Sequence, residues 1–172
     1  MKKYFLSLII TILLSSCGAS LQTIVDHNAI PKPFENPLIV IPYTSQSFSF
    51  SKNLKNNIEL KFQAEDQKIE ILFLHQESNT LTLNSNDSFE DKVNYAIIND
   101  DKDIVFIFKT TGLRYYNSSL ESIDYEVVGI ETNNFKEVWK GTMYSSSTVG
   151  PSLFANKCAE LLYDKLKIDG VL

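Results

Sequence analysis

The pattern of apolar residues changes partway along the chain, and this change limits the possible folds most strongly. In the first part, continuous apolar runs such as Leu38–Ile41 and Ile104–Phe108 predict strands buried on both faces. Two later segments, 123–131 and 135–144, instead alternate apolar and polar residues, which is typical of strands with one wet face. The turn-prone triplet 132–134 between them predicts a β-hairpin.

Three helices are predicted around these strands. The first spans about residues 51–65, with Ser51 as N-cap and Leu54, Ile58 and Phe62 at four-residue intervals. A strand from residue 58 to 64 is the alternative there, because its apolar residues also alternate. The second helix is expected at 89–99, and the third runs from Pro151 toward Gly170.

Together these elements predict an α+β fold. A further strand at 68–74, rich in β-branched and aromatic residues, is expected at the centre of the sheet. The expected order is β-α-β-α-β-β-β-α, an open mixed sheet of about five strands with about three helices.

The first residues have the organisation of a secretory signal peptide. Lys2 and Lys3 are followed by an apolar run from Tyr4 to Leu14, and small residues lead into Cys17. A membrane-spanning helix is the weaker alternative, because crossing about 30 Å of hydrocarbon takes about 20 apolar residues.

Leu14-Ser15-Ser16-Cys17 resembles the lipobox of bacterial lipoproteins. The resemblance implies cleavage before Cys17 and lipidation of its thiol, as with palmitate, whereas an ordinary signal with an incidental cysteine is the alternative. Two or more acyl chains anchor a protein stably to a membrane. Because the next residue is Gly18 and not Asp, sorting of the enterobacterial kind implies the outer membrane, with the domain facing the periplasm.

The chain therefore divides into three parts. Residues 1–16 are the signal peptide, 17–36 are the lipidated N-terminus with a short proline-bearing tether, and 37–172 form one globular domain. Removing Lys2 and Lys3 changes the net charge from −5 to about −7. Without a basic cluster, nucleic acid is not an expected partner.

No set of residues in the sequence predicts catalysis, a metal site or a cofactor. The two histidines, His27 and His75, have no glycine-flanked nucleophile near them, and the aspartates after residue 99 lack the glycine and closing glutamate of a calcium loop. Cys158 lies on an apolar helical stripe and is interpreted as packing. Trp139 and Tyr144 are the candidate partner-surface residues, although a hairpin tryptophan is more often core.

The order of elements and the hairpin sequence D-Y-E-V-V-G-I-E-T-N-N-F-K-E-V-W-K-G-T over residues 124–142 resemble envelope-lipoprotein domains related to the TolB N-terminal fold. That group includes penicillin-binding-protein activators and curli-secretion lipoproteins. The resemblance implies helices on one face of the sheet and the other face partly available to a protein. The turn 65–67 departs from it, because those domains often have glycine there.

Two functions follow as expectations. The first is a non-catalytic accessory or adaptor of an envelope complex for transport, secretion or cell-wall synthesis. The alternative is a carrier of a small apolar ligand or lipid, suggested by 11 Phe and 8 Tyr residues. The oligomeric state is not predicted.

Overall fold

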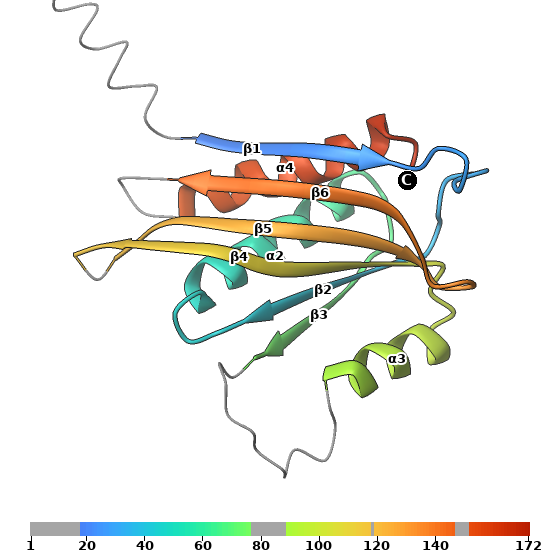
Figure 1. Cartoon of the computed structure of the whole chain (residues 1–172), viewed down its shortest axis with the longest axis horizontal. Helices are drawn as coiled ribbons and strands as arrows, with labels where there is room; N and C mark the ends of the chain where they lie inside the picture. The colour runs from blue at the N-terminus through green and yellow to red at the C-terminus, as the bar shows by residue number, and fades with distance from the viewer. Residues whose placement is uncertain (1–17, 77–88, 118, 147–151) are drawn as a thin grey trace, which may run out of the picture.

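The computed structural model describes residues 18–76, 89–117, 119–146 and 152–172. Six strands form one open mixed sheet in the order β1-β6-β5-β4-β2-β3, and the chain has an α+β fold, as predicted (Figure 1). The strands are β1 (Gly18–Val25), β2 (Pro37–Tyr43), β3 (Glu70–His75), β4 (Ile104–Tyr116), β5 (Ser119–Glu131) and β6 (Lys136–Ser146). The helices described are α2 (Phe48–Ala64), α3 (Phe89–Asn99) and α4 (Ser152–Ile168).

Parallel and antiparallel pairing divide the sheet in the way the sequence pattern indicates. The parallel pairs β2–β3 and β2–β4 come from the continuous apolar runs, and β4, β5, β6 and β1 pair antiparallel. All four residues of Leu38–Ile41 are fully buried, since both faces of β2 are covered. In β5 and β6 one face is buried, and most side chains of the other face are half-buried or exposed.

The main core lies between the sheet and the two helices α2 and α4. Leu54, Ile58 and Phe62 of α2 are fully buried, so the predicted helix is confirmed and the alternative strand is wrong. A smaller cluster on the opposite face packs α3, through Val93 and Ala96, against β2 and β4. Figure 1 shows α2 and α4 behind the sheet and α3 below it, at the β3 edge.

Helix α2 begins earlier than the sequence predicts. Its N-cap is Ser47, not Ser51, and the Ser47 hydroxyl accepts a hydrogen bond from the Thr44 backbone N–H at 3.0 Å. Ser51 lies within the helix and is fully buried, where its hydroxyl lies 2.9 Å from the hydroxyl of Tyr125. The serine expected to cap the helix therefore joins the helix to the sheet.

Strand β3 was predicted at the centre of the sheet and lies at its edge. Within the described residues β3 pairs only with β2, and the other side of β2 pairs with β4. Its residues Glu70–Leu74 are half-buried, in contrast to the fully buried run in β2.

Strand β1 falls within residues 17–36, where a tether was expected. It pairs antiparallel with β6 along its whole length, from Gly18 opposite Ser146 to Val25 opposite Trp139. The continuous pairing with β6 and the burial of Leu21 in the core explain why this segment is part of the sheet, as an edge strand. The extra strand raises the count from about five to six.

Candidate functional site

Cys17, the predicted lipidation site, lies outside the described residues. The structure does place the residue that follows it: Gly18 is the first residue of β1 and the partner of Ser146 in β6. The residue that directly follows Cys17 in the sequence therefore already belongs to the sheet. No helix among the described residues is long and apolar enough to cross a membrane.

Trp139 belongs to the core and not to a partner surface. Its side chain is 1% exposed and meets the ring of Phe106 edge to face, with 5.7 Å between centroids. The indole Nε1–H donates to Asp169 Oδ2 at 2.8 Å, which connects β6 to the chain just beyond α4. This burial agrees with the interpretation of a hairpin tryptophan as core.

Tyr144 lies on the opposite face of β6, which solvent reaches. Its hydroxyl accepts a hydrogen bond from Arg114 Nη2 at 2.9 Å, and the guanidinium lies 5.8 Å from the centre of the ring. Arg114 Nε also donates to Ser122 Oγ at 2.8 Å. These hydrogen bonds connect Arg114 of β4 to Ser122 of β5 and Tyr144 of β6.

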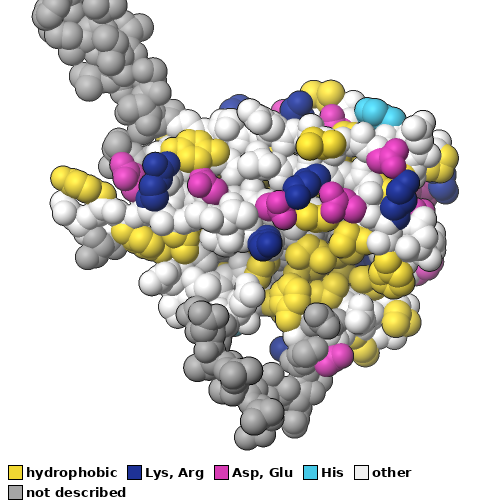
Figure 2. Space-filling view, in the orientation of Figure 1, with side chains coloured by type: hydrophobic (Ala, Val, Ile, Leu, Met, Phe, Trp, Pro, Cys, Tyr) yellow, Lys and Arg dark blue, Asp and Glu magenta, His cyan; other side chains and the backbone are white. Residues whose placement is uncertain are grey.

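The face of β1, β6 and β5 that is opposite α2 and α4 is called the outer face here. Its side chains belong to Ser20, Gln22, Ile24, Lys140, Thr142, Tyr144, Asp124, Glu126 and Val128. Figure 2 shows basic and acidic side chains alternating across this side of the molecule. The outer face is polar and has opposite charges side by side.

The pair Glu126 and Lys140 is the clearest example of this alternation. Lys140 Nζ lies 2.7 Å from Glu126 Oε2 across the β5–β6 pair. The hydrogen bond to Lys140 lowers the pKa of Glu126, and the same bond raises the pKa of Lys140. Both groups are charged near neutral pH, so they present a matched pair of charges to any partner.

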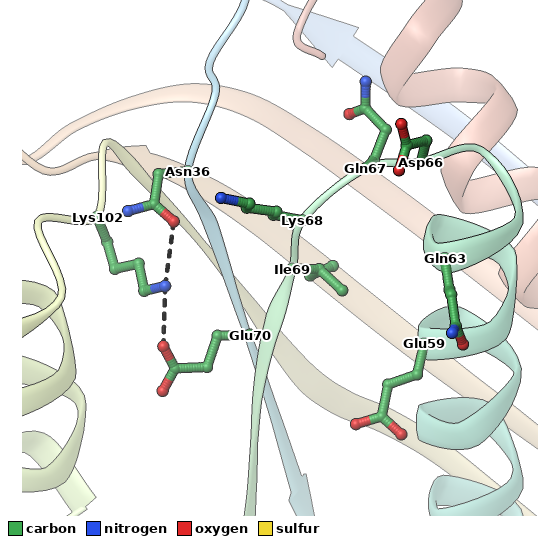
Figure 3. A pocket seen from close by; sticks show the side chains of 9 residues that line it. All are labelled: Asn36, Glu59, Gln63, Asp66, Gln67, Lys68, Ile69, Glu70 and Lys102. Carbon is green, nitrogen blue, oxygen red and sulfur yellow. Dashed lines mark hydrogen bonds and ion pairs between the residues drawn. The ribbon is translucent and has the colours of Figure 1, made fainter.

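A polar cleft of about 780 Å³ opens between the C-terminal end of α2 and the start of β3 (Figure 3). Lys102 Nζ donates to Glu70 Oε2 at 2.8 Å and to Asn36 Oδ1 at 3.1 Å. Glu59 and Gln63 of α2 lie on the other side of the cleft. The nine lining residues include no serine, cysteine or histidine, and they offer carboxylates, lysine amines and side-chain amides for charge and hydrogen-bond contacts.

A second groove, of about 550 Å³, lies between β3 and α3. Leu72, Leu74 and Ala96 contribute apolar surface to it, and Asp91, Lys92 and Glu70 contribute charge. Its volume falls within the range of about 300–1,000 Å³ that is common for small-molecule sites. Figure 2 shows hydrophobic side chains gathered on the same side of the molecule, beside α3.

The structure does not bring the titratable residues considered in the sequence into one site. His27 follows β1 and His75 ends β3, and these strands are the opposite edges of the sheet. Cys158 is fully buried on α4, and burial raises the pKa of its thiol to about 11. No group of three or more His, Cys, Asp or Glu within the described ranges is arranged to hold a metal.

Asp103 has a structural role at the α3–β4 turn. Its carboxylate accepts hydrogen bonds from the backbone N–H groups of Glu35 and Asn36, at 2.6 and 3.1 Å. The Asn36 amide in turn donates to the carbonyls of Asp100 and Asp101. The aspartate cluster fixes the segment that enters β2.

No known protein-family model and no curated protein matches the chain. Among solved structures, a PelC dodecamer from Paraburkholderia phytofirmans is similar at a TM-score of 0.54 and 14% identity, over 84% of this chain and 95% of that one. A variant PelC dodecamer from the same organism gives 0.48 and 13%, over the same shares. At this identity the PelC likeness shows a shared fold.

Proposed function

We propose that the chain is a lipoprotein, anchored through acylated Cys17, whose domain is a non-catalytic accessory subunit of an envelope protein complex. The observation that carries the proposal is the direct junction between anchor and domain. The lipobox-like sequence ends at Cys17, and β1 begins at Gly18. A domain joined in this way stays against the bilayer, beside integral membrane proteins, because it has no tether.

The outer membrane, with the domain in the periplasm, is the proposed location. It is supported by Gly18, since aspartate at that position is the retention signal for the inner membrane in enterobacterial sorting. The mature chain has a net charge of about −7 and no basic cluster, which favours a protein partner over anionic lipid or nucleic acid.

The outer face is the proposed partner surface. It is the solvent-reached side of an antiparallel sheet and lies opposite the two large helices. Tyr144, on this face, and its hydrogen-bond partner Arg114, on the neighbouring β4, are of the residue types enriched in protein interfaces. The charges of Glu126 and Lys140 are already paired with each other. When a partner covers this face, neither charge is buried without an opposite charge beside it, which would be costly.

Self-association is one form that such an assembly can take. The PelC chain with the similar fold was crystallised as a dodecamer. Mass photometry of the acylated protein in detergent measures the number of copies directly. The outer face can serve as the contact surface in either case, between one copy of this chain and a different envelope protein or between copies in a homo-oligomer.

Photo-crosslinking in intact cells tests the proposal. A photoreactive amino acid at Thr142, exposed on the outer face, is expected to give a discrete adduct with an envelope protein or with a second copy. The matched control is Leu60, which is 62% exposed on α2, on the other side of the sheet. Absence of any adduct from Thr142, or equal adducts from both positions, would count against the outer face as the partner surface.

A carrier of a small apolar ligand is the second candidate, and the groove between β3 and α3 favours it. The groove combines the apolar side chains Leu72, Leu74 and Ala96 with a few charged groups at its margin. Native mass spectrometry of protein purified from membranes tests this function. A co-purified ligand that is lost in the variant Lys92→Trp, at an exposed residue that lines the groove, supports the carrier, and unliganded protein at every preparation step contradicts it.

A further inference from the structure

The β4–β5 hairpin carries an uncharged aromatic tip. Tyr115 pairs with Leu120 and Tyr116 with Ser119, and the six residues from Tyr115 to Leu120 include no ionisable carboxylate or amine. Asn117, in the turn, has a φ of 46°, the left-handed conformation that tight hairpin turns use. Tyr116 is 70% exposed and Tyr115 is 42% exposed.

The register of the sheet places this tip at the same end as Gly18, the residue that follows the proposed anchor. Gly18 pairs with Ser146, Ser146 with Ser122, and Ser122 with Arg114, so these four residues form one row across β1, β6, β5 and β4. With about 4.8 Å between neighbouring strands, the row spans about 14 Å. Figure 1 shows the hairpin extending beyond the start of β1 at this end.

The tip reaches further along the strand direction than Gly18, the first residue of β1. Gly18 and Arg114 share one row, and Asn117 lies three residues beyond Arg114. At about 3.3 Å per residue, the hairpin extends about 10 Å past the level of Gly18. Each interfacial layer of a bilayer is about 5–7 Å thick, so the tip is long enough to enter it.

We infer that Tyr115 and Tyr116 form a second membrane contact, in which the hairpin tip inserts into the lipid headgroup layer beside the acylated Cys17. This inference rests on the proposed lipid anchor. Tyrosine is enriched at membrane interfaces because its ring is apolar and its hydroxyl stays hydrated. The contact depends on aromatic rings and not on charge, so neutral lipids support it in spite of the acidic mature chain.

Two points of attachment restrict the orientation of the domain. The acyl chains at β1 and the β4–β5 hairpin are separated by β6 and lie at the same end of the sheet, so the strands stand end-on to the membrane. The outer face then runs away from the bilayer and stays open along its length. A domain held by the lipid alone, in contrast, rotates freely about one residue.

Depth-dependent fluorescence quenching tests the inference on the full acylated protein. Tyr116→Cys is labelled with an environment-sensitive fluorophore, and the protein is inserted into phosphatidylcholine nanodiscs that contain headgroup-spin-labelled lipid. Lipidation consumes the Cys17 thiol, and Cys158 is buried, so the label goes to the introduced cysteine. Phe135→Cys is the matched control, because Phe135 is 71% exposed in the turn at the opposite end of β5.

The label at residue 116 is expected to be quenched several-fold more than the label at residue 135. A Tyr115→Cys variant repeats the measurement at the other tyrosine. The inference can then still be tested if one of the two substitutions prevents folding. Equal, weak quenching at both ends while the protein stays on the disc overturns this inference and leaves the anchor intact. Protein that leaves the disc overturns the anchor, and the inference with it.

Discussion

The buried hydrogen bond between Ser51 and Tyr125 is the clearest place to test how α2 is held to the sheet. The two hydroxyls are 2.9 Å apart and both residues are fully buried. Tyr125→Phe keeps the ring contacts with Phe50 and Phe108, whose centroids lie 6.2 and 5.5 Å away. The substitution therefore removes the hydroxyl and little else.

The expected loss follows from the group left behind. Tyr125→Phe leaves the Ser51 hydroxyl buried without this partner, which costs about 1–3 kcal/mol of unfolding free energy. Ser51→Ala leaves the tyrosine hydroxyl bonded to the Thr110 side chain, so its cost is expected near the lower end of the same range. The double variant has no unpaired serine hydroxyl, so it is expected to lose less than the sum of the two.

Urea unfolding of the unacylated Cys17→Ala protein measures all four members of this cycle. With a slope of about 1–3 kcal/mol per molar urea, a loss of 1.5 kcal/mol moves the midpoint by roughly 0.5–1.5 M. A coupling energy of about 0.5–2 kcal/mol is expected between the two positions. Additive losses within about 0.3 kcal/mol would show that the two hydroxyls do not stabilise each other, and would refute the reasoning.

Two further predictions concern the core. Gly141→Ala should cost about 1–3 kcal/mol in urea unfolding, because the new Cβ would lie 2.6 Å from the Trp139 ring, whereas Gly18→Ala meets nothing within 4 Å and should be neutral. Burial raises the pKa of the Cys158 thiol from 9.0 to about 11. As the pH rises, the thiol therefore loses its proton in the unfolded chain before it does in the folded chain. The free energy of unfolding should fall by about 2–3 kcal/mol between pH 9 and 11. Cys158→Ala should remove that part of the pH dependence, and an unchanged profile would contradict the assignment.

The helices and the hairpin were predictable because their signals are local. In α3 the apolar residues recur at helical spacing, and the observed bounds, Phe89–Asn99, agree with the prediction. The turn between β5 and β6 was predictable for the same reason, because the alternation of apolar and polar residues in the two flanking segments stops at the polar residues 132–134. Where each local pattern matches the tertiary burial, sequence reasoning succeeds.

Strand β1 was missed because its pattern conflicts with its burial. Thr23 lies on the inner side and Ile24, which is 75% exposed, lies on the outer side, so the alternation is reversed at the end of the strand. The edge position of β3 depends on which strand pairs with the other side of β2, and no local pattern encodes that choice. The hairpin tip became a candidate contact only when the cross-strand register placed it at the same end of the sheet as Gly18.

Membrane fractionation of cells that express the wild-type chain or Cys17→Ala tests the central claim most directly. The lipid-anchor account predicts that the wild-type chain is found in the membrane fraction, with acyl chains on Cys17 detected by mass spectrometry of its N-terminal peptide. It predicts that Cys17→Ala is folded, with an unchanged urea midpoint, and is found in the soluble fraction. A Cys17→Ala protein that stays in the membrane fraction would contradict the anchor and the function proposed from it.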